Sequence, residues 1–231
     1  MPRTNKFSAQ LGILPAAQRG LWLELSCVPD DFVLYGGTAL ALHLGHRNSV
    51  DFNFFSDRPL RLAELETNVP FISGAKIIQR EENTLSAIVD RGGPVKVSFF
   101  GVPKLQRLSA PQIAADNNLK VASLIDLAGT QASVVQVRAE AKDYIDMDAL
   151  MRLGSIGLPM ALAAAQRLYG TGFNPEVTLK ALSYFGDGNL VELPNDLKLR
   201  LITAARQVDL DQLPDLNSAL RRDNLDYGSE L

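Results

Sequence analysis

The chain has 231 residues, of which 46% are hydrophobic and 21% charged, as in an ordinary globular protein that buries a sizeable core. Its net charge of −3 gives no global electrostatic case for nucleic acid, so such a partner would need a local basic patch, and no basic run stands out. No charged and then apolar leader opens the chain, and no apolar run approaches the ~18 residues of a membrane span, so we expect a cytoplasmic protein with no membrane partner.

The N-terminal stretch predicts one helix. Residues 1–14 have little pattern, and we expect them to include a loose end. Pro15 then opens a stretch in which apolar residues recur at helical spacing up to about Cys27. Cys27 is the single cysteine and lies in an apolar run, which is typical of a buried, structural thiol rather than a nucleophile.

A strand, a glycine turn and a second strand follow. The strand formers of residues 32–35 pass through Gly36-Gly37-Thr38 into an Ala/Leu-rich stretch that predicts a short helix. Glycines let the backbone approach a ligand closely, and the N-terminus of a helix favours an anion such as phosphate. A turn that merely joins a strand to a helix is the alternative that the residues alone leave open.

The next strand, residues 50–55, carries two polar groups on one face. Strand alternation places Asp51 and Asn53 side by side, while Phe52 and Phe54 face the other way. Two neighbouring oxygen-bearing side chains suit a hard cation such as magnesium. A phosphate cradle beside a carboxylate indicates metal-assisted phosphoryl or nucleotidyl chemistry.

The remaining elements of the first half predict a small mixed sheet. An amphipathic helix is expected at residues 60–69, and a hairpin at residues 75–80 and 84–90. Residues 95–100 form the last expected strand. Five strand-like segments with two or three helices favour an α+β fold rather than the regular alternation of a doubly wound parallel sheet.

From residue 121 onward the apolar period becomes helical. We expect Leu124, Leu127, Val134 and Val137 to form a buried stripe on a first helix. Further helices are predicted at 141–153, 159–169, 175–185 and 194–208. The predicted organisation is a core at residues 1–120, a helical region at 121–216 that completes a cleft, and a disordered tail at 217–231.

A charged group lies on the second of these helices. Lys142 and Asp146 are i,i+4 neighbours, and Asp143 lies three residues before Asp146, so a cation and two carboxylates share one flank. Taken alone, this pattern is more often a solvated, salt-bridged face. Arg47 lies in the loop before the strand at residues 50–55. It could contact a phosphate or form an ion pair with Asp51.

Two segments resemble the AbiEii/AbiGii family of nucleotidyltransferase-like proteins, whose members are toxins of bacterial toxin–antitoxin and phage-abortive systems. They are GGTALALHLGHRNSVDFNFF, residues 36–55, and RAEAKDYIDMDAL, residues 138–150. A Gly-Gly-Thr turn, a His-Arg-x-Ser-x-Asp run and a distal Lys-Asp-x-x-Asp, in this order, make a fairly specific match. The resemblance covers roughly Leu21 to Leu153, and the helical remainder more loosely.

The resemblance implies roles for these residues. The turn Gly36-Gly37-Thr38 would hold the triphosphate of an NTP, with the Thr38 hydroxyl as a donor, and Arg47 and Arg138 would contact phosphate. Asp51 and Asn53 would bind Mg²⁺ or Mn²⁺. Lys142 would neutralise triphosphate charge, and Asp143 or Asp146 would orient it or act as a base.

Three positions depart from the family pattern in ways that remove charge. Asn53 replaces the second metal-binding aspartate, so we expect a weakened metal site. Ser98 stands where a third carboxylate is expected, although an ordinary strand serine is an equally good interpretation. Gln131 stands where many relatives carry a lysine.

The function implied by the resemblance is that of a toxin that moves a nucleotidyl group, or a phosphoryl group, from an NTP. The acceptor would be RNA, such as a tRNA end, or a protein side chain, and the protein would have a cognate antitoxin. The alternative is a catalytically degenerate relative that binds a nucleotide or a partner. Asn53, Ser98 and Gln131 favour that alternative.

Overall fold

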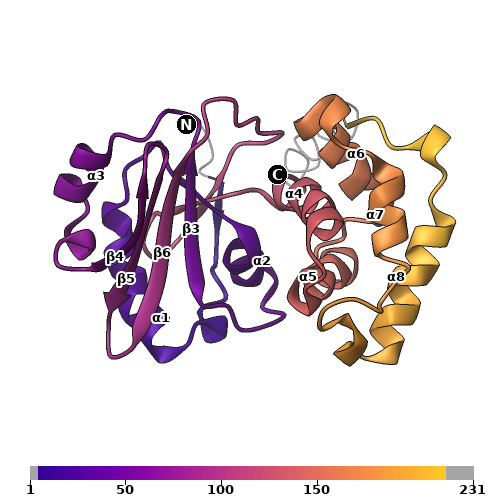
Figure 1. The fold of residues 1–231 in the computed structure, drawn as a ribbon, viewed down its shortest axis with the longest axis horizontal. Coiled ribbons are helices and arrows are strands. Elements are labelled where there is room, and N and C mark those ends of the chain that lie inside the picture. Colours follow the sequence, from indigo (N-terminus) through magenta and orange to yellow (C-terminus); the bar gives the residue numbers. More distant parts are fainter. Residues whose placement is uncertain (1–4, 217–231) are drawn as a thin grey trace, which may run out of the picture. The chain divides into compact units, whose positions relative to one another are not determined.

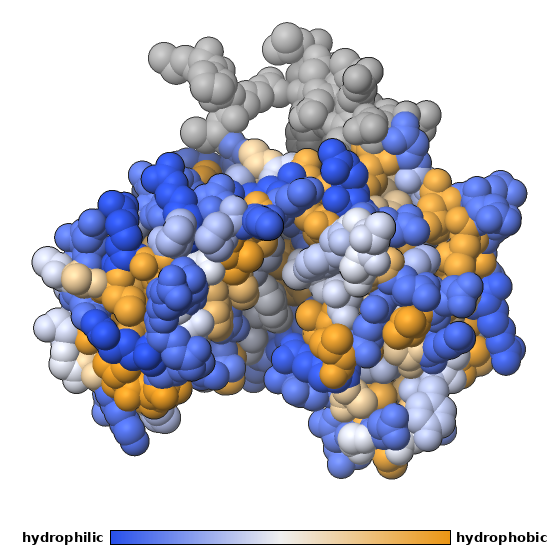
Figure 2. Space-filling model, turned by 45° about the horizontal axis from the view of Figure 1, so that its top comes forward, coloured by the Kyte–Doolittle hydropathy of each residue, from blue (hydrophilic) through white to orange (hydrophobic). Residues whose placement is uncertain are grey.

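The computed structural model describes residues 5–216 (Figure 1). The chain divides into two compact units, Met1–Ser123 and Leu124–Leu231. The predicted disordered tail at 217–231 lies outside the described residues. Hydrophilic residues predominate in the surface view of Figure 2 and are interrupted by separate hydrophobic patches.

The first unit is built on a mixed sheet that has eight strands in the described part of the chain. Their order across the sheet is β1-β7-β8-β2-β3-β6-β5-β4. The strands are β1 (Lys6–Phe7), β2 (Val33–Tyr35), β3 (Asp51–Ser56), β4 (Lys76–Glu81), β5 (Thr84–Asp90), β6 (Pro94–Gly101), β7 (Gln112–Ala114) and β8 (Lys120–Val121). The helices of this unit are α1 (Ala16–Trp22), α2 (Gly36–Leu44) and α3 (Leu62–Asn68). The α+β fold class is therefore confirmed.

The two faces of the sheet differ because its strands alternate. Phe52 and Phe54 of β3 are fully buried and pack with Trp22 and Phe99 on the face that α1 covers. Asp51, Asn53 and Phe55 lie on the opposite face and are half-buried. Figure 1 shows α1 behind the strands and no helix of the first unit in front of β3 and β6.

The second unit is helical. Its helices are α4 (Leu124–Val137), α5 (Ala141–Arg152), α6 (Leu158–Tyr169), α7 (Pro175–Ala181) and α8 (Asn195–Gln207). Helix α4 contacts α5, α6 and α7, while α5 also contacts α8. The close approach of α4 to α6 favours a glycine, because a Cβ at Gly129 would lie 3.0 Å from the main-chain atoms Ala164 C and Ala165 N.

Several detailed expectations were wrong. Part of the expected loose end forms β1, and Ile13 and Leu14 are buried. The predicted stripe on α4 is misplaced, since Val137 is 82% exposed. The residues that α4 buries are Asp126, Leu127, Ala128, Gly129, Gln131, Ala132 and Val135.

The cysteine is less enclosed than its sequence context suggested. Cys27 ends a short 3₁₀ segment, Leu23–Cys27, and is only half-buried. Partial burial still raises the pKa of its thiol, which disfavours the reactive thiolate. No helix in residues 5–216 combines the length and apolarity that crossing a membrane requires.

Candidate functional site

The glycine turn lies where β2 passes directly into α2. Gly36 has φ +80°, a left-handed conformation that favours glycine, and it is the first residue of the helix. The N-cap residue, Tyr35, supplies no side-chain hydrogen bond to this helix end. The turn lies close to Asn53, because a Cβ at Gly36 would be 3.8 Å from Asn53 Nδ2.

Thr38 fastens this turn to β3. Its side chain is 3% exposed, and its hydroxyl donates to the main-chain oxygen of Asp51 at 2.5 Å. Thr38 Oγ1 also lies 2.7 Å from Ser49 Oγ. Because the hydroxyl proton is engaged with Asp51, the expectation of a Thr38 donor to phosphate has no support here, and the residue positions the turn instead.

Asp51 and Asn53 are the polar pair of β3. Asn53 is paired in register with Tyr35 of β2 and Ser98 of β6, and Asp51 with Lys96. The side chains of Asp51 and Asn53 form no hydrogen bond or ion pair with any residue in the range 5–216. The strand therefore presents a carboxylate and an amide that the fold itself does not use.

These two side chains fit a divalent ion only in part. Within the described ranges no group of three or more His, Cys, Asp or Glu residues is arranged to hold a metal. One carboxylate oxygen and one amide oxygen on the same face suit an ion such as Mg²⁺, which usually completes its shell with water and substrate phosphate. The pair thus fits an ion that arrives with a nucleotide better than a permanent metal centre.

Ser98 occupies the position opposite Asn53 but is not poised as a base. It is 1% exposed, and its hydroxyl accepts a hydrogen bond from Ser86 Oγ at 2.9 Å. Both serines therefore form a buried cross-strand pair between β5 and β6.

Arg138 and Asp143 form a tight ion pair in the second unit. The Nε and Nη2 atoms of Arg138 donate to the two carboxylate oxygens of Asp143 at 2.6 and 2.8 Å. The Asp143 side chain is only 2% exposed, whereas that of Arg138 is 45% exposed. Gln131 Nε2 donates to the main-chain oxygen of Asp143 at 3.0 Å. Gln131 thus ties α4 to the first turn of α5.

The rest of the charged group on α5 is split between surface and core. Lys142 is half-exposed, and its Nζ lies 2.6 Å from Glu140 Oε2. The hydrogen bond from Lys142 lowers the pKa of Glu140. Asp146, in contrast, is fully buried. The interpretation of one solvated, salt-bridged flank therefore holds for Lys142 and is wrong for Asp143 and Asp146.

The first unit thus brings Gly36, Asp51 and Asn53 together, and the second brings Arg138 and Asp143 together. Arg47 lies in the loop before β3, where its Nη1 donates to the main-chain oxygen of the adjacent Asn48 at 3.0 Å. Because the Asp51 side chain has no ion-pair partner in residues 5–216, the expected pair between Arg47 and Asp51 is not formed in this structure.

Two further features of the fold were not predicted from the sequence. Asp148 is buried between Arg200 and Arg152, although its partner Arg200 lies 52 residues away. Phe55 shares the face of Asp51 and Asn53, as the alternation that placed those two residues would also have predicted.

Comparisons with solved structures agree with this fold. One is a candidate nucleotidyltransferase from H. pylori, with a TM-score of 0.52 and 16% identity, over 85% of this chain and 94% of that one. Another is MenT4, a nucleotidyltransferase toxin from Mycobacterium tuberculosis H37Rv, with a TM-score of 0.53 and 16% identity, over 88% of this chain and 89% of that one. At this identity the two structures establish a shared fold.

Sequence comparisons identify the family. An uncharacterized protein of Aquifex aeolicus (strain VF5), aq_aa25, is 29% identical over 160 residues, which cover 68% of this chain and 75% of that protein. A family model described as the nucleotidyl transferase AbiEii toxin of a type IV toxin–antitoxin system matches residues 23–226. The chain therefore belongs to the AbiEii family of nucleotidyl transferase toxins.

Proposed function

We propose that this protein transfers a nucleotidyl group from an NTP to a hydroxyl group of an RNA, such as a tRNA end, or of a protein side chain. It would act in the bacterial cytoplasm as the toxin of a toxin–antitoxin pair, with a cognate antitoxin. The observation that carries the proposal is the half-buried carboxylate of Asp51, which has no partner among the described residues and lies beside the Gly36 turn.

The reaction exchanges a phosphoanhydride bond of the NTP for a phosphoester bond to the acceptor. The acceptor oxygen forms a bond to the α-phosphorus, the bond from that phosphorus to the bridging oxygen breaks, and pyrophosphate leaves. The acceptor hydroxyl loses its proton to solvent or to a carboxylate. Because Ser98 is neutral and already hydrogen-bonded, the proposal assigns it no part in this proton transfer.

The first unit would hold the nucleotide. Main-chain N–H groups of Gly36 and Gly37, at the N-terminus of α2, would bind phosphate oxygens. Asp51 and Asn53 would bind Mg²⁺ or Mn²⁺ together with those oxygens, and the ion would supply neutralisation of the charge that develops on the phosphates. Arg47 would contact phosphate from the preceding loop.

The second unit would add positive charge. Lys142 is a half-exposed cation of α5 that pairs with Glu140, and its proposed role is to neutralise phosphate charge. Asp143 binds the Nε and Nη2 groups of Arg138, and the remaining Nη1 group would donate to phosphate. Asp143 and Asp146 are buried, which favours a positioning role for them over direct proton transfer.

A catalytically degenerate binding module is the second candidate. Ser98 gives the sheet face no carboxylate opposite Asn53, and Gln131 is occupied with the main-chain oxygen of Asp143. Both observations favour a protein that still binds a nucleotide or a partner but does not catalyse transfer.

Two isotopic labels distinguish these functions. The protein is incubated with each of the four NTPs, labelled at the α- or the γ-phosphorus, with Mn²⁺ or Mg²⁺, and with bacterial RNA or protein as acceptor. Nucleotidyl transfer predicts acceptor labelling from the α-label only, and loss of labelling in Asp51→Asn. Labelling from the γ-label would indicate phosphoryl transfer instead. No labelling despite NTP binding would support the degenerate module.

A further inference from the structure

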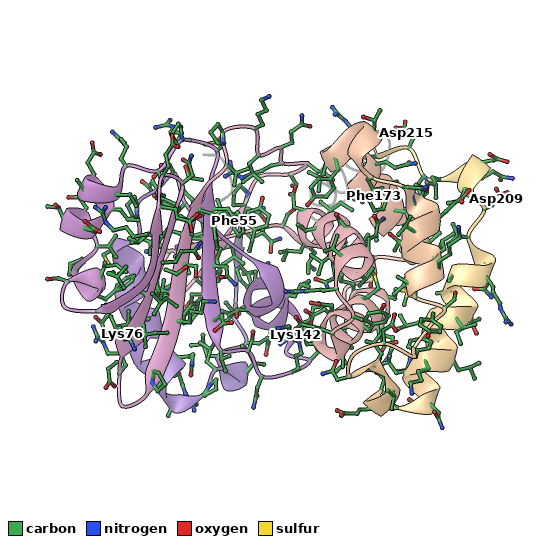
Figure 3. The ribbon with its side chains drawn as sticks, viewed as in Figure 1. Phe55, Lys76, Lys142, Phe173, Asp209 and Asp215 are labelled. Carbon is green, nitrogen blue, oxygen red and sulfur yellow. The ribbon has the colours of Figure 1, made fainter. Side chains whose placement is uncertain are left out.

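Three aromatic side chains form a row on the sheet face that carries Asp51. The rings of Phe55 (β3) and Phe100 (β6) stack with centroids 4.8 Å apart, and Tyr35 (β2) meets Phe55 edge-on at 5.5 Å. Phe55 and Phe100 are half-buried, and Tyr35 is 6% exposed. Figure 3 labels Phe55 on β3. We call Tyr35, Phe55 and Phe100 the aromatic row.

The opposite face of the sheet carries a second stacked aromatic pair, which is part of the buried core. Phe54 and Phe99 are the strand neighbours of Phe55 and Phe100, stack at 5.1 Å and are fully buried. Cross-strand aromatic pairs commonly stabilise sheets in this way. The aromatic row repeats the arrangement on the face that α1 does not cover, where the rings of Phe55 and Phe100 remain partly exposed.

The chemistry of this face changes steadily along β3. The register places charged Asp51 and Lys96 in one row, polar Asn53 and Ser98 in the next, and Phe55 with Phe100 in the third. Asp51 and Phe55 are four residues apart, which is roughly 13 Å along an extended strand. A nucleoside triphosphate presents the same order of groups, from anionic phosphates through a hydroxylated sugar to an aromatic base.

The side chain of Arg107 lies near the C-terminal end of β3, the end that carries Phe55. β3 is followed by Asp57, which contacts Arg107 Nη1 at 3.4 Å. The Nε and Nη2 atoms of Arg107 are buried and have no hydrogen-bond partner in the described part of the chain. Buried donors without partners cost free energy, and acceptor atoms of a ligand would recover it. The Nε and Nη2 groups of a guanidinium point the same way, so together they can donate to two neighbouring acceptor atoms of one ligand.

We infer that the aromatic row is the subsite for the nucleobase of the NTP, with Arg107 donating to acceptor atoms on the edge of the base. This inference rests on the proposed function, because the phosphates of the same NTP occupy the Gly36 turn and Asp51. Stacking on an aromatic side chain tolerates every base, so the row provides affinity without selecting one NTP.

Two probes separate the base subsite from the phosphate site. The dissociation constants of an NTP and of inorganic triphosphate, each with Mn²⁺, are measured by calorimetry on the full chain. Phe100→Leu removes the ring and keeps an apolar side chain. We expect it to weaken NTP binding about tenfold, the range for loss of one stacking contact, and to leave triphosphate binding unchanged.

Matched variants guard against a general disturbance of the sheet. Ile78→Ala, at an exposed position on β4, should bind both probes as the wild type does. Arg107→Gln should weaken NTP binding only, whereas Arg80→Gln removes an exposed arginine paired with Glu66 and should change neither probe.

The outcomes distinguish the inference from the proposed function. If the wild type binds both probes and Phe100→Leu binds NTP as tightly as the wild type, the base subsite is wrong while the phosphate site stands. If Arg107→Gln weakens both probes equally, Arg107 contacts phosphate and its assignment to the base is wrong. If the wild type binds neither probe, both the inference and the proposed function are overturned.

Discussion

The sheet and helix α5 use their aspartates in opposite ways. Asp51 of β3 is half-buried, and its carboxylate has no partner in residues 5–216. Asp143 and Asp148 of α5 are almost fully buried, and each accepts two hydrogen bonds from one arginine. The contrast supports the proposal that Asp51 of the sheet binds a ligand, whereas Asp143 and Asp148 of α5 form buried ion pairs within the fold.

The largest effect should come from Asp51→Asn, which removes the unpartnered carboxylate. We expect the rate of nucleotidyl transfer to fall about 1,000-fold, or ~4 kcal/mol, as when one well-placed electrostatic group is lost. The thermal midpoint should change little, because the fold uses only the main chain of Asp51. Initial rates of α-label transfer and thermal unfolding check this. A large fall in the midpoint would show that Asp51 is structural.

Asp148→Asn should produce the opposite profile. Asp148 is 4% exposed and joins α5 to α8 through Arg200. Removing its charge should lower the free energy of unfolding by about 3 kcal/mol, because two arginines lose a buried partner. Denaturant unfolding measures this, with Asp196→Asn as the control at the exposed second contact of Arg200. Equal losses of unfolding free energy in Asp148→Asn and Asp196→Asn would contradict a special role for the buried Asp148–Arg200 ion pair.

The Arg138–Asp143 pair can be tested by a double-mutant cycle. If Asp143 acts chiefly by holding Arg138, Arg138→Gln and Asp143→Asn should couple by about 1.5 kcal/mol in unfolding free energy. The double variant should then transfer nucleotide no more slowly than the worse single variant. Additive losses of transfer rate would instead assign Asp143 a role of its own in the reaction.

Asn53→Asp should strengthen the proposed binding site for a divalent ion. A second carboxylate beside Asp51 should tighten the site for a divalent ion and raise the transfer rate about tenfold, or ~1.4 kcal/mol. Asn53→Gln is the neutral control. Transfer rates across a Mn²⁺ titration provide the measurement, and a site retired from catalysis would gain nothing from the aspartate.

The smallest expected effect concerns His43 and pH. Burial lowers the pKa of His43 below its ordinary 6.5, and its Nε2 donates to the main-chain oxygen of Ala122 at 2.9 Å. The unfolded chain therefore binds a proton near pH 6.5 that the folded chain does not. Stability should be full above pH 6.5 and should decline as the pH falls below it, by less than about 1 kcal/mol near pH 6.

His43→Gln provides the control for this pH effect, because glutamine can donate to Ala122 but does not titrate. Denaturant unfolding between pH 5 and 8 should show a steeper acid decline in the wild type than in the variant. Parallel curves would contradict the assignment.

The sequence predicted the parts of the fold that have a clear period. β3 alternates over six residues, so its placement and its two faces could be predicted. The hairpin at residues 76–90 could be predicted from its two strand-like runs on either side of Glu81-Glu82-Asn83. β1, β7 and β8 have only two or three residues, too few to show alternation. Helix α4 buries small residues such as Gly129 against α6, so a stripe sought among its larger residues was misplaced.

The site was only partly predictable for a different reason. Local patterns place Asp51 and Asn53 on one face, but they do not reveal whether a carboxylate is free or paired. The arginine that engages Asp148 lies 52 residues away, and the Thr38 hydroxyl is taken by a main-chain oxygen 13 residues later. Such partners are set by tertiary contacts, which the spacing of apolar residues along the sequence does not predict.

We propose that Asp51 and the Gly36 turn bind an NTP together with a divalent ion. The most direct test is the thermal midpoint of the wild type and of Asp51→Asn with each NTP, with and without Mn²⁺. We expect the midpoint of the wild type to rise only when the ion is present and that of the variant not to rise, because only a ligand that prefers the folded state raises the midpoint. No rise with any NTP at millimolar concentration, or an equal rise in the variant, would contradict it.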